Sequence, residues 1–135
     1  MNETLKTLET RRSCRKFIAD KMPTKEQLDA IIRAGTFAPS GMGRQPVKII
    51  AVTNKKMRNK ISEENAKVMG QSGTDPFYGA PVILVVIADK SASTAIYDGS
   101  LVMGNLLNAA ESLGLGSIWI HRAKEEFESD FGKQL

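Results

Sequence analysis

The sequence contains one cysteine and one histidine, and it has no long apolar run. A single cysteine, Cys14, excludes an internal disulfide and is typical of a reducing compartment. One cysteine and one histidine are also too few for an ordinary zinc site. No apolar stretch approaches the roughly 20 residues of a membrane span, and the polar N-terminus lacks the apolar stretch of a secretory signal. We therefore expect a cytoplasmic protein with no metal centre and no membrane partner.

The sequence motifs of several enzyme classes are missing as well. The chain has no GxxxxGK(S/T) phosphate loop, no GxGxxG dinucleotide fingerprint and no GxSxG nucleophile elbow. A nucleophilic pair of Cys14 and His121 has only the two residue types in its favour. If the chain is an enzyme, we expect a bound cofactor to carry the reaction instead of catalytic side chains.

The length and charge leave few other classes open. At 135 residues, with 41% apolar and 25% charged residues, the chain is expected to form a single domain over residues 1–135. The net charge of +4 and the basic clusters at residues 11–16 and 55–60 leave nucleic-acid binding as an alternative. No aromatic residues interleave with those cations to stack bases, so we expect no nucleic-acid partner.

Apolar spacing and capping signals predict helices over residues 2–10, 24–35, 54–68, 94–113 and 123–135. In the first helix, Leu5 and Leu8 are spaced to face a core. In the second, Thr24 and Gln27 have the spacing of a capping box, and Gly35 is expected to end the helix. The helix over 123–135 is predicted to be continuous and amphipathic.

Two of the predicted helices carry further expectations. Met57, Ile61 and Val68 are expected to point inward from the third helix. The helix over 94–113 is apolar on nearly every side, which is typical of a helix surrounded by protein. A chain this small can hardly enclose such a helix alone, so we expect part of its surface to meet a second subunit, with Gly104 among the residues that permit close approach.

Runs of β-branched and apolar residues predict buried strands at 47–53 and 82–88 and a short third strand at 117–120. Because strands and helices alternate, the fold class is α/β (α+β). Residues 38–46, APSGMGRQP, hold glycines and a serine between two prolines and are expected to form a shaped loop.

Two segments could contact a ligand. RRSCRKF, residues 11–17, places arginines beside a serine, and the guanidinium group donates paired, charge-assisted hydrogen bonds to phosphate. The alternative is a basic helix end that simply faces solvent. The glycines of APSGMGRQP would let the backbone approach a flat ligand closely, and an ordinary turn is the alternative.

Together and in this order, RRSCRKF, APSGMGRQP, FYGAPVILVV and DGSLVMGNLLNAAESLGLGSIWI resemble the nitroreductase family of FMN-dependent oxidoreductases. The resemblance implies a central β-sheet flanked by helices, and a homodimer built around a buried long helix with FMN at the interface. It also implies ping-pong transfer of a hydride from NADH or NADPH through flavin N5 to a small-molecule acceptor such as a nitroaromatic or quinone. A non-catalytic or degenerate flavin-binding protein of the same fold remains the alternative.

The resemblance assigns cofactor-binding residues and no catalytic side chain. The residues are Arg11, Arg12, Ser13, Arg15, Pro39, Ser40, Gly41, Gln45, Asn65, Ile120, His121 and Arg122. Residues 11–13 are expected at the FMN phosphate and ribityl chain, and Arg15 at the pyrimidine edge. Residues 39–41 are expected to line the flavin of the partner subunit, and the backbone of 120–122 to lie near flavin N5 and O4.

The sequence departs from the family pattern at three places. Gly43 stands where many members carry asparagine, and Val47 replaces a common tryptophan. Family chains usually continue through another strand and a tail that crosses the partner, so we expect the C-terminal end of this chain to be incomplete. Asn105 is expected to be a buried, hydrogen-bonded residue of its helix and not a flavin contact.

Overall fold

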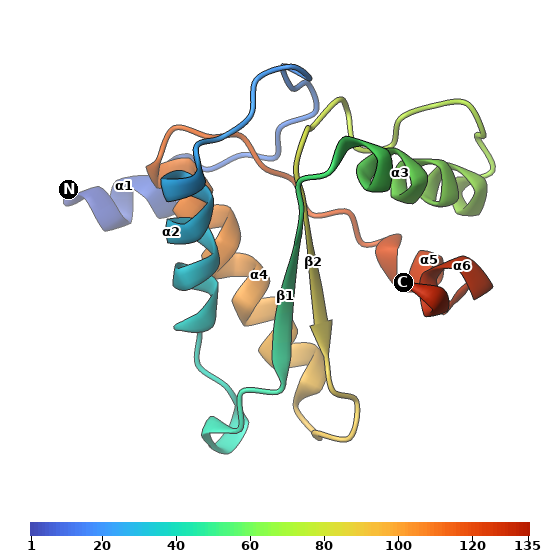
Figure 1. Cartoon of the computed structure of the whole chain (residues 1–135). Coiled ribbons are helices and arrows are strands. Elements are labelled where there is room, and N and C mark those ends of the chain that lie inside the picture. Colours follow the sequence, from blue (N-terminus) through green and yellow to red (C-terminus); the bar gives the residue numbers. More distant parts are fainter. The chain divides into compact units, whose positions relative to one another are not determined.

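The computed structural model describes all residues from Met1 to Leu135 and contains six α-helices, one 3-10 helix and two strands (Figure 1). In chain order they are α1 Glu3–Thr10, α2 Lys25–Thr36, η1 Gly41–Gly43, β1 Val47–Val52, α3 Lys55–Met69, β2 Ile83–Ala88, α4 Ala95–Ser112, α5 Ala123–Glu128 and α6 Asp130–Gln134. The mixture of helices and a small sheet confirms the predicted α+β class. None of the helices combines the length and the apolar character needed to cross a membrane.

The chain divides into two compact units, each assembled from three segments. The first unit comprises Met1–Cys14, Pro23–Ala51 and Leu84–Trp119. The second comprises Arg15–Met22, Val52–Ile83 and Ile120–Leu135.

The first unit is built from a two-stranded sheet and helices α1, α2 and α4. The amide of Asp89 donates to the carbonyl of Pro46 at 2.9 Å, so the end of β2 lies beside the start of β1 and the strands are antiparallel. Helices α2 and α4 pack together beside this two-stranded sheet (Figure 1). The core consists of Ile31, Ala38, Val102, Leu106 and Ala110, with Val47, Ile49, Leu84, Val86, Ala109 and Leu115 packed against it.

Local signals place helices α2 and α4 as predicted. Both hydrogen bonds of the Thr24–Gln27 capping box are present at the start of α2. The helix α4 ends where expected, and Gly114 follows it with φ of +75°, a conformation that favours glycine. The Asn105 side chain donates to the carbonyl of Ala34 at 2.9 Å, which confirms the expected hydrogen bond, although the residue is half-buried and not buried.

Three predictions about the first unit are wrong. Leu5 and Leu8 are 48% and 53% exposed, because α1 buries no residue in this chain. Gly35 lies inside α2 and does not end it: a Cβ there would come within 2.7 Å of a Leu106 methyl group, so the glycine permits close packing of α2 on α4. The strand expected at 117–120 is reduced to an isolated parallel bridge between Ser13 and Ser117.

The strands also differ from the expected fully buried type. Along β1, half-buried Val47 and Ile49 alternate with exposed Lys48 and Ile50, and Ile50 is 47% exposed. Within the first unit, the helices pack against only one face of the two-stranded sheet, so side chains at alternate positions stay accessible.

The second unit contains α3, α5, α6 and the loop over residues 70–81. On α3, Ile61 is buried as predicted, but Val68 is 39% exposed, which is a wrong prediction. The buried face of α3 carries polar residues among its apolar ones, including Arg58, Ser62 and Asn65. An apolar-spacing argument cannot find such a face, because its polar members are buried through their hydrogen bonds.

Asp75 holds the loop over residues 70–81 against α3. Its carboxylate accepts from Arg58 at 2.7 Å, from Ser62 at 2.9 Å, and from the amides of Phe77 and Gly79 at 3.1 and 2.9 Å. Burial alone raises the pKa of Asp75, but these hydrogen bonds outweigh it, so the pKa lies below its usual value.

The C-terminal helix is not continuous as predicted. Ser129 adopts an extended conformation with ψ of 162°, ends α5 and caps α6 by accepting from the amide of Gly132 at 3.1 Å. A serine favours such a cap, because its hydroxyl satisfies an amide that lacks a partner in the first turn. Phe127 and Phe131 are half-buried, and Leu135 is 52% exposed.

Candidate functional site

The basic segment predicted from the sequence directly follows α1. Arg11 caps the C-terminus of this helix, and its amide donates to the carbonyl of Thr7 at 3.1 Å. The Nη1 atom of Arg12 donates to the carbonyls of Glu9 and Arg11 at 2.9 and 2.8 Å, so part of this guanidinium satisfies the helix end. The Nη1 atom of Arg11 is buried and has no hydrogen-bond partner.

The unpartnered Arg11 nitrogen points to an absent acceptor. A guanidinium remains charged at any physiological pH, so Arg11 cannot relieve its burial by losing a proton. Leaving a buried donor unpaired costs about 1–3 kcal/mol, and more for a charged group. An anion would remove that cost. Ser13 is exposed and forms a bridge to Ser117, which fixes the backbone next to the two arginines.

The loop over residues 38–46 is fixed to α4 through Asp98, a residue that is only 2% exposed. The Asp98 carboxylate accepts from the amide of Gly41 at 2.9 Å and from the hydroxyl of Thr94 at 2.7 Å. A Cβ on Gly41 would lie 2.3 Å from the Thr94 hydroxyl oxygen, so only glycine fits here. The predicted residues Pro39 to Gly41 are thus held in a defined backbone conformation.

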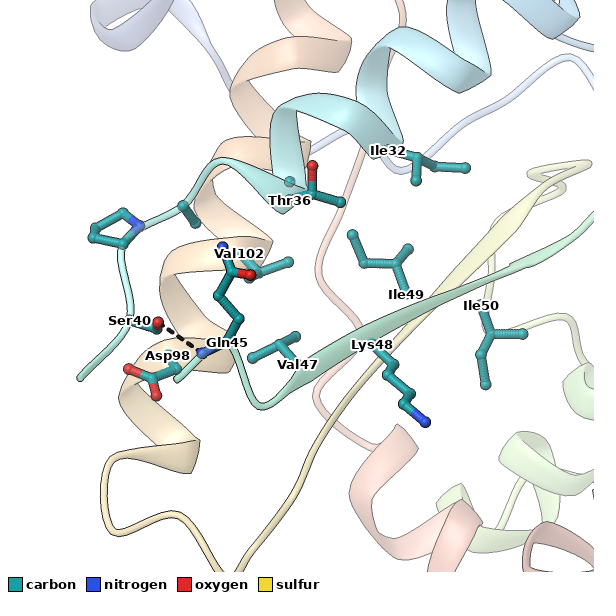
Figure 2. A pocket seen from close by; sticks show the side chains of 13 residues that line it. Ile32, Thr36, Ser40, Gln45, Val47, Lys48, Ile49, Ile50, Asp98 and Val102 are labelled. Atoms are coloured by element: carbon teal, nitrogen blue, oxygen red, sulfur yellow. Dashed lines mark hydrogen bonds between the residues drawn. The ribbon is translucent and has the colours of Figure 1, made fainter. Parts of the chain in front are cut away.

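The same loop is closed by a second hydrogen bond. The amide of Gln45 donates to the hydroxyl oxygen of Ser40 at 3.0 Å (Figure 2). Gln45 has a φ of +51° and Met42 a φ of +55°, which are uncommon for residues other than glycine. Because the Ser40 hydroxyl acts as acceptor in this bond, its own proton remains available for a ligand.

An open cavity of about 440 Å³ lies between α2, this loop, β1 and α4 (Figure 2). Its volume falls within the range of roughly 300–1,000 Å³ that is usual for small-molecule sites. Its walls are mostly apolar, and the loop contributes Pro39, Ser40 and Gln45 to the lining. Of the residues predicted in the loop, all but Gly41 therefore share one concave surface.

In the second unit, the structure brings together two predicted residues, Asn65 and Arg122. Nη1 of Arg122 donates to Oδ1 of Asn65 at 3.0 Å, and Nδ2 of Asn65 donates to Oε1 of Glu126 at 3.1 Å. Asn65 and Glu126 are both 0% exposed. Oε2 of Glu126 has no hydrogen-bond partner.

Burial governs the acidity of Glu126. It raises the pKa of this carboxyl to about 7, the hydrogen bond from Asn65 lowers it in part, and the neighbouring charge of Glu64 raises it further. Glu126 therefore takes up or releases a proton near neutral pH.

The remaining predicted residues of the second unit are more accessible. Arg15 and His121 are exposed, and Ile120 is half-buried. The carbonyls of Ile120 and His121 accept from the amides of Ala123 and Lys124 in the turn that leads into α5. The predicted set is thus divided, with residues 11–13 and 39–45 in the first unit and residues 15, 65 and 120–122 in the second.

Sequence reasoning missed two residues of these arrangements, Asp98 and Glu126. Asp98 is the one acidic residue in the first three turns of an otherwise apolar helix, and that isolation was an available signal. Glu126 occurs in the acidic run of AKEEFESDF, and its neighbours three and four residues away are Arg122, Ala123, Ser129 and Asp130. No apolar stripe therefore marks it for burial.

The model of the Nitroreductase family matches residues 8–131. An FMN reductase [NAD(P)H] of Bacillus subtilis is 34% identical over 140 residues, which cover 87% of this chain and 53% of that protein.

Two solved structures are similar over nearly the whole chain. A nitroreductase with bound FMN from Bacteroides fragilis gives a TM-score of 0.90 at 27% identity, covering 99% of this chain and 78% of that one. A nitroreductase with bound FMN from Desulfitobacterium hafniense gives 0.87 at 33% identity, covering 100% and 81%. The chain spans between 53% and 68% of the length of the curated relatives it matches.

Proposed function

The chain belongs to the nitroreductase family, and from this we propose that it is the FMN-binding part of an oxidoreductase that uses NAD(P)H. Relatives named FMN reductase and NADPH-flavin oxidoreductase, and similar structures with bound FMN, support this proposal. The observation in this chain that carries it is the buried Nη1 of Arg11, a charged donor without an acceptor beside Arg12 and Ser13.

These residues fit the phosphate of FMN. The group is a dianion with several acceptor oxygens, and a guanidinium donates to such oxygens in pairs. Arg11 would supply its unpartnered nitrogen, Ser13 its exposed hydroxyl, and Arg12 the donors that it does not use at the end of α1. Phosphate binding would give the buried Nη1 atom of Arg11 an acceptor. It would thereby remove the free-energy cost of leaving that donor unpaired.

The other predicted residues would surround the ring system. Arg15 would place a fixed positive charge at the pyrimidine edge, where it stabilises negative charge that develops on reduction. Half-buried Arg122 would contribute a polar contact, and fully buried Asn65 would act through it by accepting from its guanidinium. The backbone around Ile120 and His121 would donate N–H groups. The rigid loop of Pro39 to Gly41 would cover the flavin of a partner subunit and exclude water.

The chemistry supplied by bound FMN is acceptance of a hydride at N5 from NADH or NADPH and its delivery to an oxidised acceptor such as a nitroaromatic or quinone. The protein's residues would bind, orient and shield the ring, and no side chain acts as an obligatory catalyst. We propose a homodimer as the active assembly, because the loop and the arginine segment would contact different copies of the flavin.

Anaerobic absorbance spectroscopy tests this function. The purified chain is titrated with FMN, and NADH or NADPH is then added, followed by a quinone. A flavin band that bleaches with the nicotinamide and returns with the quinone is the expected result. Retention of a flavin that neither nicotinamide bleaches would instead identify a non-catalytic flavin-binding protein. Failure to bind FMN would contradict the proposal.

A further inference from the structure

Glu126 is buried without a role in the function proposed above. Its side chain is 0% exposed, its Oε2 has no hydrogen-bond partner, and its one side-chain hydrogen bond comes from the amide of Asn65. Burying a carboxyl group with one oxygen unpaired destabilises the fold, so the presence of Glu126 at this position suggests a role other than stability.

The contact with Asn65 fixes the direction of its amide group. The amide presents an acceptor, Oδ1, to Arg122 and a donor, Nδ2, to Glu126. A flipped amide would point its donor at the Arg122 donor and its acceptor at the Glu126 oxygen, so both hydrogen bonds would be lost. The carboxyl group and the guanidinium together therefore allow one amide orientation.

We propose that Glu126 is a positioning residue: its carboxyl group orients the Asn65 amide, which in turn holds the Arg122 guanidinium in the geometry required for flavin binding. This inference rests on the proposed function, in which Arg122 is a flavin contact and Asn65 lies behind it. Glu126 itself touches neither the cofactor nor the substrate.

The charges around Glu126 make this positioning dependent on pH. On α3, Glu64 repels the ionised form, and Lys67 lies 3.6 Å from Glu64 and partly offsets it. Arg122, which precedes α5, attracts the ionised form across the Asn65 amide. An ionised carboxylate accepts a stronger hydrogen bond than the acid does. The hydrogen bond from Asn65 to Glu126 should therefore strengthen as Glu126 loses its proton near pH 7.

The first arm of the test uses the flavin-free chain. The side-chain NH₂ resonances of Asn65 are followed by NMR as the pH is raised through neutrality. In the wild type they should shift with a midpoint near that of Glu126. In Glu126→Gln the shift should disappear, because the glutamine still accepts from Nδ2 but does not titrate. Glu128→Gln, which removes an exposed charge from the same helix, should titrate like the wild type.

The second arm measures FMN affinity by titration of flavin fluorescence. Glu126→Met removes the acceptor of the Asn65 Nδ2 group, leaves Arg122 alone to orient the amide, and should weaken FMN binding by about tenfold, the effect of one lost hydrogen bond. Glu126→Gln should restore most of that affinity while abolishing its pH dependence. Glu128→Gln should leave both affinity and pH dependence unchanged.

The outcomes separate this inference from the proposed function. Wild-type behaviour of both the Asn65 resonances and the FMN affinity in Glu126→Met would overturn the inference. A chain that never binds FMN would overturn the proposed function and the flavin part of the inference, while the NMR arm would still decide whether Glu126 orients Asn65. If Glu126→Met does not fold, Glu126→Gln decides through the pH dependence alone.

Discussion

Two buried side-chain atoms have no hydrogen-bond partner within the chain, Nη1 of Arg11 and Oε2 of Glu126. The two side chains carry opposite charges, and the cost of leaving each atom unpaired is relieved in a different way. An arginine keeps its proton and needs an external acceptor, whereas a buried glutamate can take up a proton near neutral pH. At the scale of single residues, Arg11 therefore points to a ligand and Glu126 to internal positioning.

Replacement of Arg11 by methionine should separate ligand binding from stability. Because the Nη1 atom is unpaired in the flavin-free chain, Arg11→Met should leave its thermal stability unchanged or raise it. FMN affinity should fall by about 10- to 100-fold, the effect of losing a charge-assisted hydrogen bond. Thermal unfolding and FMN titration measure the two effects. Lys6→Met removes an exposed charge from α1 as a control, and an equal loss of affinity there would indicate net charge as the cause.

Replacement of Glu126 by glutamine should change how stability depends on pH. The pKa of Glu126 is 4.5 without the protein's influence and about 7 in the fold. The stability from its bound proton is fully present below pH 4.5 and is lost as the pH rises to about 7.

Glutamine does not titrate, so Glu126→Gln should match the wild type near pH 4.5. Above pH 7 it should be more stable, by on the order of 2 kcal/mol. Urea unfolding at both pH values measures the difference, and Glu128→Gln controls for loss of an exposed charge on α5. Equal stability of Glu126→Gln and wild type at high pH would show that the buried carboxylate carries no penalty.

Among the elements, those with a complete local signal were predicted well. The capping box of α2, the glycine after α4 and the β-branched runs of β1 and β2 each act within a few residues. The prediction failed where packing between elements decides. Gly35 was predicted to end a helix, but it lies inside α2 and permits close contact with Leu106 of α4. Ser129 is a different case, because its cap on the Gly132 amide is a local signal that the predicted continuous helix overlooked.

The candidate site divides in the same way. The arginine segment and the loop over residues 38–46 could be predicted because their residue types suit a phosphate and a flat ring. Asp98 and Glu126 were missed, because a carboxylate in a helix is ordinarily solvent-exposed and their partners are distant in the sequence. Gly41 lies 57 residues from Asp98, and Asn65 lies 61 residues from Glu126.

The loop over residues 38–46 should lose its order when Asp98 is replaced. Asp98→Ala leaves the Gly41 amide and the Thr94 hydroxyl without an acceptor, which should cost roughly 2–4 kcal/mol for two buried donors. Hydrogen exchange of the Gly41 amide should speed up by more than the global loss of stability explains. Asp98→Asn keeps one acceptor oxygen and should show a smaller effect; unchanged exchange in Asp98→Ala would exclude Asp98 as the anchor.

At the scale of the whole molecule, the family match over residues 8–131 runs through segments of both compact units. The predicted flavin contacts are likewise distributed over both. The single domain expected from the length remains a prediction. The exposed apolar surface of α4 suggests that a second copy of the chain covers it.

The exposed face of α4 should be an interface between two copies. Tyr97 and Leu101 are 71% and 47% exposed, and Gly104 continues their face at helical spacing. A Cβ on Gly104 would meet no atom of its own chain within 4 Å. Gly104→Leu should therefore leave the monomer fold intact or stabilise it by about 1 kcal/mol through helix propensity.

If two α4 helices pack closely in the homodimer, the same leucine would force them apart. Overpacking of this kind costs about 1–3 kcal/mol, so the dimer dissociation constant should rise by roughly 5- to 150-fold. Sedimentation equilibrium measures that constant. FMN affinity should fall as the dimer weakens, because residues 39–41 would line the partner's flavin. Ala30→Leu adds the same side chain to the exposed side of α2 as a control. A wild-type chain that is monomeric and still binds FMN would contradict the homodimer and leave Arg11 as the better-supported determinant of the site.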